Sequence, residues 1–199
     1  MLSFSQRFSK RSFDIVISTI ALSITWWIIA IAYAIASLET KSNGFFIQTR
    51  VGRNGKPFSL IKIKTMRPLK NYSTTITTSK DPRITKYGAF FRQTKIDELP
   101  QLLHVLLGSM SLVGPRPDVS GYTDTLSGED ALILTLRPGI TGPATLKYKH
   151  EEELLATQME PKRYNDEIIW PDKICINRKY LNEWSFWGDI HYLWRTLKS

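Results

Sequence analysis

The longest apolar stretch of the chain runs from Ile15 to Leu38 and contains no charged residue. As a helix it is roughly 36 Å long, enough to reach across a bilayer core of about 30 Å. It is apolar on all sides, and a buried core helix of this length does not suit a chain of only 199 residues. We therefore predict an N-terminal membrane-embedded helix within residues 1–40 and a separate domain in residues 41–199.

Three arrangements of this helix compete. A cleaved signal peptide is suggested by Ala34-Ile35-Ala36, but the apolar run is longer than a typical signal sequence. The other two are an ordinary transmembrane span and a re-entrant helix, which enters and leaves the membrane by the same face. Basic residues favour the cytoplasmic side of a membrane. They flank both ends of the run, so we favour the re-entrant form. These flanking residues are Arg7, Lys10, Arg11, Lys41, Arg50, Arg53 and Lys56.

A re-entrant helix needs a bend, and the apolar run contains no proline. Hydroxyl side chains can satisfy backbone groups that are freed where a membrane helix breaks. The hydroxyl residues available for this are Ser18, Thr19, Ser23 and Thr25.

After the membrane segment, alternation predicts two short strands, Phe45–Gln48 and Phe58–Lys64, with a turn at Asn54-Gly55. The period of two places Lys62 and Lys64 on one face, as a cationic ledge. The Ser/Thr-rich stretch Lys70–Lys80 lacks periodicity and predicts a mobile loop. A turn at Asp81-Pro82 then leads to a basic helix that includes Arg92.

Helical spacing of leucines continues from Asp97 to Leu107, with Gly108 as a stop. Pro100 is tolerated only in a first turn, so we expect the helix to start near Asp97. Asp97 is therefore interpreted first as an N-cap, which stabilises a helix by roughly 1 kcal/mol. Its neighbour Glu98 makes the position unusual, because two adjacent acids follow an almost purely cationic segment.

Two proline-containing loops, Gly114-Pro115-Arg116-Pro117 and Arg137-Pro138-Gly139-Ile140-Thr141-Gly142, each contain one arginine. Proline reduces the entropy lost on binding, and the guanidinium fork suits phosphate oxygens. Further on, the aromatic segment Tyr180–Leu197 predicts an amphipathic helix. Such a helix either lies in the membrane interface or packs on the core, and the pattern leaves both open.

The composition strengthens the case for an anionic partner. The chain has 27 Lys plus Arg against 18 Asp plus Glu, a formal net charge of +9. Between Lys41 and Lys95 the only acid is Asp81. A single cysteine, Cys175, excludes an intrachain disulfide, and no Cys/His cluster has zinc spacing. The expected fold is α+β and mostly helical, with a small β-hairpin and interfacial amphipathic helices.

Six motifs occur in an order that resembles the bacterial sugar transferases, the monotopic phosphoglycosyl transferases. They are Phe46-x-Gln48-x-Arg50-Val51-Gly52, Lys62-x-Lys64-Thr65-Met66, Asp81-x-Arg83-x-Thr85, Asp97-Glu98-Leu99-Pro100-Gln101, Gly108-x-Met110-Ser111-x-Val113-Gly114-Pro115-Arg116-Pro117 and Arg137-Pro138-Gly139-x-Thr141-Gly142. The likeness runs from about Lys10 to Leu197. One departure is that the family usually breaks its membrane helix at a Ser-Pro pair, where this chain has Trp26-Trp27.

The resemblance implies transfer of a sugar 1-phosphate from a UDP-sugar to polyprenyl (undecaprenyl) phosphate, giving polyprenyl diphosphate sugar and UMP. In the family this is the first membrane step of surface glycan assembly, as in capsule, O-antigen, exopolysaccharide or glycoprotein glycan. It implies a re-entrant membrane helix and a catalytic domain on the cytoplasmic face of the bacterial inner membrane. No nucleic-acid partner is expected, and the oligomeric state is left open, with a homodimer as one option.

For the site, the resemblance implies Asp97 as the nucleophile and Glu98 as its partner, acting as metal ligand or in proton handling. A carboxylate can attack phosphorus and split one transfer into two steps. Two carboxylates can also hold Mg²⁺, which neutralises diphosphate charge. The best phosphate clamp is Arg116. Further phosphate-binding candidates are Lys62, Lys64, Arg92, Arg137, Pro115 and Pro117.

A non-catalytic alternative is a membrane-anchored basic binding or scaffold protein. It would explain the positive charge and the apolar helix. It would not explain paired acids followed by two proline-stiffened arginine loops.

Overall fold

The computed structural model describes residues 2–67 and 81–198. The expected mobile loop Lys70–Lys80 lies outside the described residues. The α-helices are α1 (Phe4–Thr40), α2 (Lys86–Gln93), α3 (Gln101–Leu107), α4 (Pro143–Lys147), α5 (Glu151–Ala156), α6 (Pro161–Tyr164), α7 (Trp170–Asn182) and α8 (Phe186–Lys198). The strands are β1 (Phe45–Val51), β2 (Pro57–Ile63), β3 (Ser111–Val113) and β4 (Gly139–Thr141). This part of the chain is mostly helical with small sheets, which confirms the α+β class.

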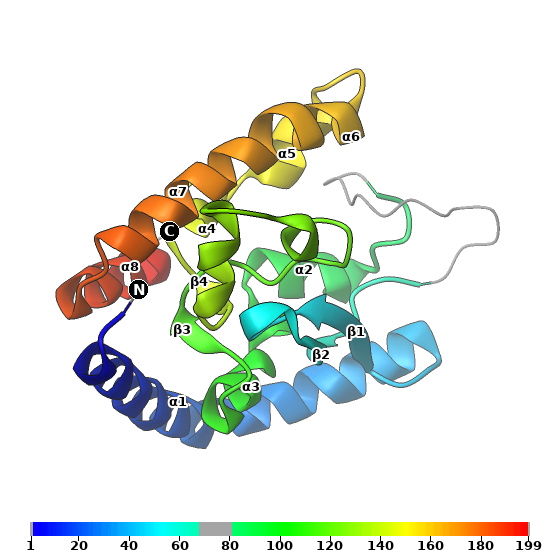
Figure 1. Cartoon of the computed structure of the whole chain (residues 1–199). Helices are drawn as coiled ribbons and strands as arrows, with labels where there is room; N and C mark the ends of the chain where they lie inside the picture. The colour runs from blue at the N-terminus through cyan, green and yellow to red at the C-terminus, as the bar shows by residue number, and fades with distance from the viewer. Residues whose placement is uncertain (1, 68–80, 199) are drawn as a thin grey trace.

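Helix α1 follows the lower edge of the molecule and bends between its dark-blue and light-blue halves (Figure 1). A capping box of Ser3 and Gln6 starts it, and it continues unbroken through Trp26-Trp27. Side-chain hydroxyls bond to the carbonyls of the preceding turn, as in Thr19 to Ile15 at 2.8 Å and Thr25 to Ala21 at 2.7 Å. Bonds of this kind bend helices, so they account for curvature without proline.

Both halves of α1 pack against the rest of the chain. Its first half contributes Phe13 and Ile17 to a hydrophobic cluster built around Leu102, Val105 and Met110. Its second half contributes Ala32 and Ala36 to another cluster, with Ile63 and Phe91. The helix therefore shares both clusters with residues 41–199, and the division at residue 40 stays a prediction.

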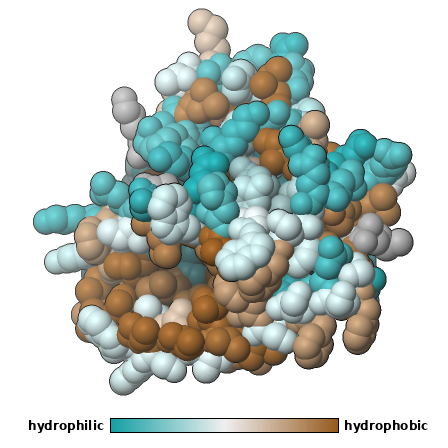
Figure 2. Space-filling model, turned by 90° about the vertical axis from the view of Figure 1, so that its left-hand side faces the viewer, coloured by the Kyte–Doolittle hydropathy of each residue, from teal (hydrophilic) through white to brown (hydrophobic). Residues whose placement is uncertain are grey.

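The opposite face of α1 is bare. In its most apolar 18-residue window only 11 % is buried. In Figure 2 the apolar surface gathers along the lower edge of the molecule, whereas most of the hydrophilic surface lies above it. A core helix would be covered, and an apolar face left exposed in this way is typical of a surface that contacts a membrane or another protein.

The predicted hairpin is confirmed. Strands β1 and β2 pair antiparallel with Gln48 opposite Leu60, and Asn54 in the connecting turn has φ 58°. The strand ends at Ile63, so Lys64 lies just outside it. The buried imidazole of His104 in α3 accepts from the backbone N–H of Ile61 at 3.1 Å, which fixes α3 against β2.

The second proline-containing segment is not only a loop, as the sequence suggested. Residues Gly139–Thr141 form β4, which pairs parallel with β3. Three glycines bring this segment against the first loop, because a Cβ on Gly139 would lie 2.2 Å from the backbone nitrogen of Gly114, and one on Gly142 would lie 2.4 Å from its oxygen. Only glycine allows so close an approach of two backbones.

The expected amphipathic helix Tyr180–Leu197 is divided, because Tyr180 belongs to α7 and the chain turns before α8. Trp184 in the turn is buried, whereas Trp187 and Trp194 of α8 are exposed. Helix α8 thus packs on the core through one face and presents aromatic side chains on the other. Its interfacial location stays a prediction.

Candidate active site

Asp97 and Glu98 lie on a single 3-10 turn, Ile96–Glu98, between α2 and α3. Lys95 enters this turn with φ 59°, and Pro100 occupies the N-cap position of α3. Neither the turn nor α3 has a side-chain cap hydrogen bond, so the interpretation of Asp97 as an N-cap is wrong. The expected helix start near Asp97 also moves to Gln101. Both carboxylates are buried, which capping does not explain.

Glu98 is held by two cations from distant segments. Lys62 Nζ of β2 lies 2.8 Å from its Oε1, and Arg116 of the proline loop reaches the same oxygen at 2.5 Å. Burial alone would raise the pKa of Glu98, but Arg116 and Lys62 hold it well below its usual range. Glu98 is therefore ionised at neutral pH, and it fixes the positions of two phosphate-binding candidates.

Asp97 has a different environment. Burial and the neighbouring charge of Glu98 raise its pKa to about 6, against the opposing effect of Lys62, Arg92 and Lys95. Among the described residues its Oδ1 is buried and has no hydrogen-bond partner. The two adjacent carboxylates are thus unequal: Glu98 is neutralised by the protein, and Asp97 keeps an available oxygen.

Arg116 is positioned by the close packing of the two proline segments. The N–H of Gly139 donates to the carbonyl of Pro115 at 2.7 Å, and the N–H of Gly114 donates to Thr141 at 2.9 Å. On the far side of Arg116, the carbonyl of Pro117 accepts from Arg50 at 3.2 Å. Pro115 and Pro117 therefore act through backbone geometry that holds Arg116 beside Glu98.

The structure brings only some of the predicted phosphate-binding residues together. Lys62 and Arg116 meet at Glu98, and Arg92 of α2 pairs with Glu152 of α5 while its charge acts on Asp97. Lys64 instead donates to Ser42 at 2.9 Å. Arg137 lies apart from this group, because its Nε donates to the carbonyl of Gly108 at 2.8 Å and, among the described residues, it makes no hydrogen bond or ion pair with Asp97 or Glu98. Its phosphate-binding role stays a prediction.

Two site residues were not singled out from the sequence. Arg50 of β1 and Gln101 of α3 line a small hollow together with Lys62 and Arg116. Within the described residues, Arg50 Nε and Gln101 Nε2 are buried donors without partners. Both residues belong to motifs that resemble the family, and this could have identified them as site residues. No rule of sequence spacing, however, indicates that β1 and α3 lie side by side.

Asp118, which follows Pro117, is a third residue that the motifs did not reveal. Burial raises its pKa to about 6, while Lys173 and Arg50 lower it. Its backbone carbonyl accepts from Val51 at 2.9 Å, which ties the proline loop to the end of β1. We assign it a positioning role.

The groups near Asp97 and Glu98 determine whether the expected Mg²⁺ could bind here. In the described part of the chain no cluster of three or more acidic, histidine or cysteine residues is present. Mg²⁺ commonly uses one or two carboxylates together with substrate phosphates. Asp97 Oδ1 suits that requirement, whereas the Glu98 carboxylate is already engaged by Lys62 and Arg116. The residues fit a metal held by Asp97 and a diphosphate, and the metal itself stays a prediction.

Comparison with known proteins gives the family. The model of the bacterial sugar transferase family matches residues 5–199. The chain is 35 % identical to UDP-glucose:undecaprenyl-phosphate glucose-1-phosphate transferase of Escherichia coli K12, over 98 % of this chain and 41 % of that protein. It is 33 % identical to the protein of the same name in Caulobacter vibrioides, over 96 % of this chain and 68 % of that protein. An uncharacterized sugar transferase of Bacillus subtilis, EpsL, is 34 % identical over 96 % of this chain and 86 % of its own length.

The chain thus spans about two fifths of the Escherichia coli relative and most of the Bacillus subtilis one. The match covers every element of the site, from Arg50 to the proline segments. This chain belongs to the bacterial sugar transferase family.

Proposed function

We propose that this chain transfers a sugar 1-phosphate from a UDP-sugar to a polyprenyl phosphate, with release of UMP. The observation that carries the proposal is a set of unpartnered polar groups around Lys62 and Arg116, whose charges act on both Asp97 and Glu98. Within the described residues, Arg50 and Gln101 provide buried donors that suit phosphate oxygens, and Asp97 provides a free carboxylate oxygen. The names of the relatives support the same substrate classes.

The proposed reaction has two displacements. Asp97 Oδ1 attacks the phosphorus that carries the sugar, a new carboxyl–phosphorus bond forms, and the diphosphate bond breaks with UMP as leaving group. An oxygen of polyprenyl phosphate then attacks the same phosphorus, and the Asp97 carboxylate is regenerated. Arg116, Lys62 and Arg50 bind and orient the phosphates, since they surround Glu98 with more positive charge than it neutralises.

We propose Asp97 as the protein ligand of Mg²⁺. When bound, the metal would neutralise charge on the diphosphate leaving group. Glu98 would act as a fixed anion that sets the geometry of Lys62 and Arg116, with no direct metal contact in this arrangement.

We also propose that α1 is re-entrant and that the remaining residues lie on the cytoplasmic face of the inner membrane. Lys10, near the start of α1, bonds to Asp189 of α8, and Ala36, near its end, packs with Ile63 and Phe91. A spanning helix would place these ends on opposite sides of a bilayer core about 30 Å thick. One compact body cannot contact both ends in that case, whereas a bent helix allows it (Figure 1).

Cysteine labelling tests this topology. In a Cys175→Ser background, Ser5→Cys and Lys56→Cys are expected to be shielded from an impermeant thiol reagent added outside intact cells, and to react after permeabilisation. Labelling of Ser5→Cys alone in intact cells would establish a spanning helix and contradict the re-entrant proposal.

The activity is tested by UMP release from a panel of UDP-sugars, with a short polyprenyl phosphate and Mg²⁺. We expect release with at least one donor, and formation of the polyprenyl diphosphate sugar only when polyprenyl phosphate is present. A membrane-anchored scaffold would release no UMP from any donor. Since the donor sugar is unspecified, the panel should include glucose, galactose and N-acetylated sugars.

The decrease of the reaction rate at acidic pH, the acid limb of the pH profile, should follow the protonation of Asp97. Because the attacking group must be ionised and its pKa is about 6, single-turnover UMP release should fall tenfold per pH unit below about pH 6. Polyprenyl phosphate should be left out, since a phosphate monoester itself titrates near pH 6. Arg92→Gln is expected to move the limb to higher pH, because Arg92 lowers the pKa of Asp97. A rate that is flat between pH 5 and 7 would contradict the assignment.

A further inference from the structure

A second hollow shares no lining residue with the one lined by Lys62 and Arg116. It lies where the first turns of α1 meet the hairpin turn and the segment before β4. Three arginines line it, Arg7, Arg53 and Arg137. The function proposed above uses none of them.

Each of these arginines is held by one nitrogen and leaves the others available. Arg53 Nε donates to the carbonyl of Thr135 at 2.9 Å, and Arg7 Nε donates to Leu2 at 2.9 Å. Arg137 Nε is fixed on Gly108 at 2.8 Å. Within residues 2–67 and 81–198 their terminal nitrogens make no hydrogen bond to protein. The guanidinium groups are thus positioned and still have donors to offer.

The charge in this hollow is not balanced by the protein. Burial, then the charges of Arg53 and Arg11, lowers the pKa of Arg137, and only Asp14 opposes them. Asp14 is also the only carboxylate among the described residues that line the hollow, and it accepts from the backbone N–H of Leu112 at 3.0 Å.

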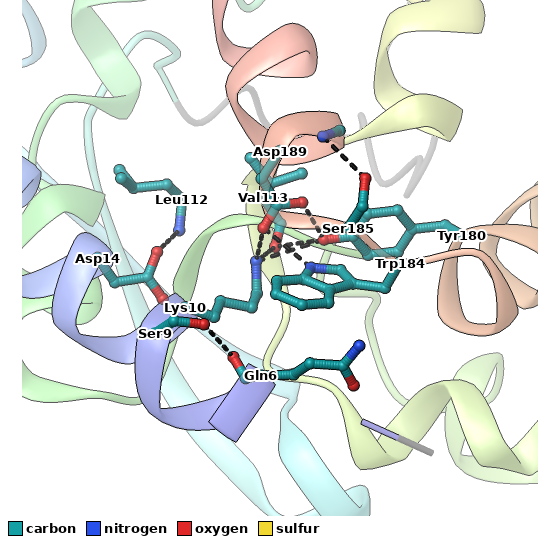
Figure 3. A network of polar contacts seen from close by, with 11 residues as sticks. Gln6, Ser9, Lys10, Asp14, Leu112, Val113, Tyr180, Trp184, Ser185 and Asp189 are labelled. Atoms are coloured by element: carbon teal, nitrogen blue, oxygen red, sulfur yellow. Dashed lines mark hydrogen bonds and ion pairs between the residues drawn. The ribbon is translucent and has the colours of Figure 1, made fainter. Parts of the chain in front are cut away.

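Lys10 lines the hollow as well, but its charge is already matched. Figure 3 shows its ammonium group directed toward Asp189, with which it pairs at 2.5 Å. Three arginines therefore face a single carboxylate. The cost of holding these cations together is offset when an anion binds between them.

Exposed apolar residues that are close in sequence to the residues lining or holding the hollow indicate the nature of that anion. Phe4 and Phe8 flank Arg7 in the first turns of α1 and are exposed, Phe4 to 84 %. Leu107, which precedes the Gly108 carbonyl that holds Arg137, is 80 % exposed. Exposed apolar residues so close in the chain to a basic hollow suit a ligand with a phosphate head and acyl chains better than a free ion.

We infer that Arg7, Arg53 and Arg137 form a binding site for the headgroup phosphate of an anionic membrane phospholipid. The bound lipid joins the start of α1 to the hairpin turn and to the segment that carries β4. It is separate from the site of sugar-phosphate transfer, and its occupancy does not depend on a UDP-sugar.

The test is the thermal unfolding midpoint of the full chain in a neutral detergent. It is titrated with dioctanoyl phosphatidylglycerol, dioctanoyl phosphatidylcholine or inorganic phosphate. We expect a saturable rise with phosphatidylglycerol only. An equal rise with phosphatidylcholine would show acyl-chain binding without phosphate recognition, and an equal rise with inorganic phosphate would show a free-anion site. Either result would overturn the inference.

Variants assign the effect to the hollow. Arg53→Gln with Arg137→Gln should abolish the response, whereas Lys86→Gln with Lys149→Gln, an equal loss of charge at two exposed lysines away from the hollow, should keep it. Arg7→Gln alters an exposed side chain, so it should fold normally, and it should raise the half-saturating lipid concentration about tenfold. Equal loss in the lysine pair, or an unchanged response in Arg7→Gln and the arginine pair, would refute the site.

Discussion

Asp97→Asn is expected to abolish sugar-phosphate transfer and, at the same time, to stabilise the folded chain at neutral pH. The carboxamide has the shape of the carboxylate but is a very weak nucleophile, so UMP release should fall by at least about 10³-fold. A labelled sugar phosphate should no longer become covalently attached to the protein. Wild-type turnover by this variant would exclude Asp97 as the nucleophile.

The stability change follows from the pKa of Asp97. Its value is about 6 in the folded chain and 3.8 in an unfolded one, so the folded state disfavours the ionised form. Wild-type stability therefore falls as the pH rises from about 4 to about 6 and stays lower above that. The neutral carboxamide would carry no such penalty, and the variant should be more stable at pH 7 by up to about 3 kcal/mol. The gap should close below pH 4.

Glu98→Gln is the matched control for this effect. It also removes one charge from the same turn, but Glu98 is ionised with Lys62 and Arg116 on its oxygens. Loss of that charge leaves two cations beside each other, so this variant should be less stable than the wild type. Thermal unfolding of both variants between pH 4 and pH 8 measures the contrast. If both variants shift stability in the same direction, the two carboxylates do not have separate roles.

The sequence predicted the helices and strands of this site better than the contacts between residues that are distant in the chain. The hairpin, the helix with Arg92 and the stop at Gly108 follow from local rules of alternation, capping and backbone freedom. Asp97 was interpreted as a cap by the same rules. They failed there because Pro100 takes the N-cap position and the acids occupy a separate 3-10 turn.

Long-range geometry accounts for what the sequence did not show. Lys62 and Lys64 differ by two positions, yet β2 ends between them and only Lys62 reaches Glu98. Arg116 and Arg137 have similar proline contexts, but the backbone contact between Gly114 and Gly139 leaves only Arg116 beside the acids. Such outcomes depend on strand ends and backbone contacts that no spacing rule contains.

The second large effect is expected at Lys10, far from the reacting groups. Its ammonium lies 2.5 Å from Asp189 of α8 and 2.8 Å from the carbonyl of Val113 in β3. Asp189 also accepts from Tyr180 at 2.6 Å and from Trp184 at 3.1 Å (Figure 3). All these groups are buried, so the network joins the start of α1, β3 and the two C-terminal helices through one ion pair.

Lys10→Met keeps the length of the side chain and removes its charge, which leaves Asp189 buried without a cation. Breaking a buried pair in this way costs about 3–5 kcal/mol. The thermal midpoint in detergent should therefore fall by roughly 10 °C or more. Lys56→Met, at an exposed lysine outside the network, should change it little.

The double variant Lys10→Met with Asp189→Asn decides whether the loss comes from the unpaired charge. Replacing both members of a buried pair by neutral groups is often close to neutral, and the introduced carboxamide oxygen would still accept from Tyr180 or Trp184. We therefore expect the double variant to be more stable than Lys10→Met alone, with strong coupling in the double-mutant cycle. Val113, which accepts from Lys10, precedes Gly114 and the Arg116 loop, so we expect Lys10→Met to lower UMP release as well as stability. The double variant should regain both. Two losses that simply add would show that Lys10 and Asp189 stabilise the chain independently and that no ion pair joins α1 to α8.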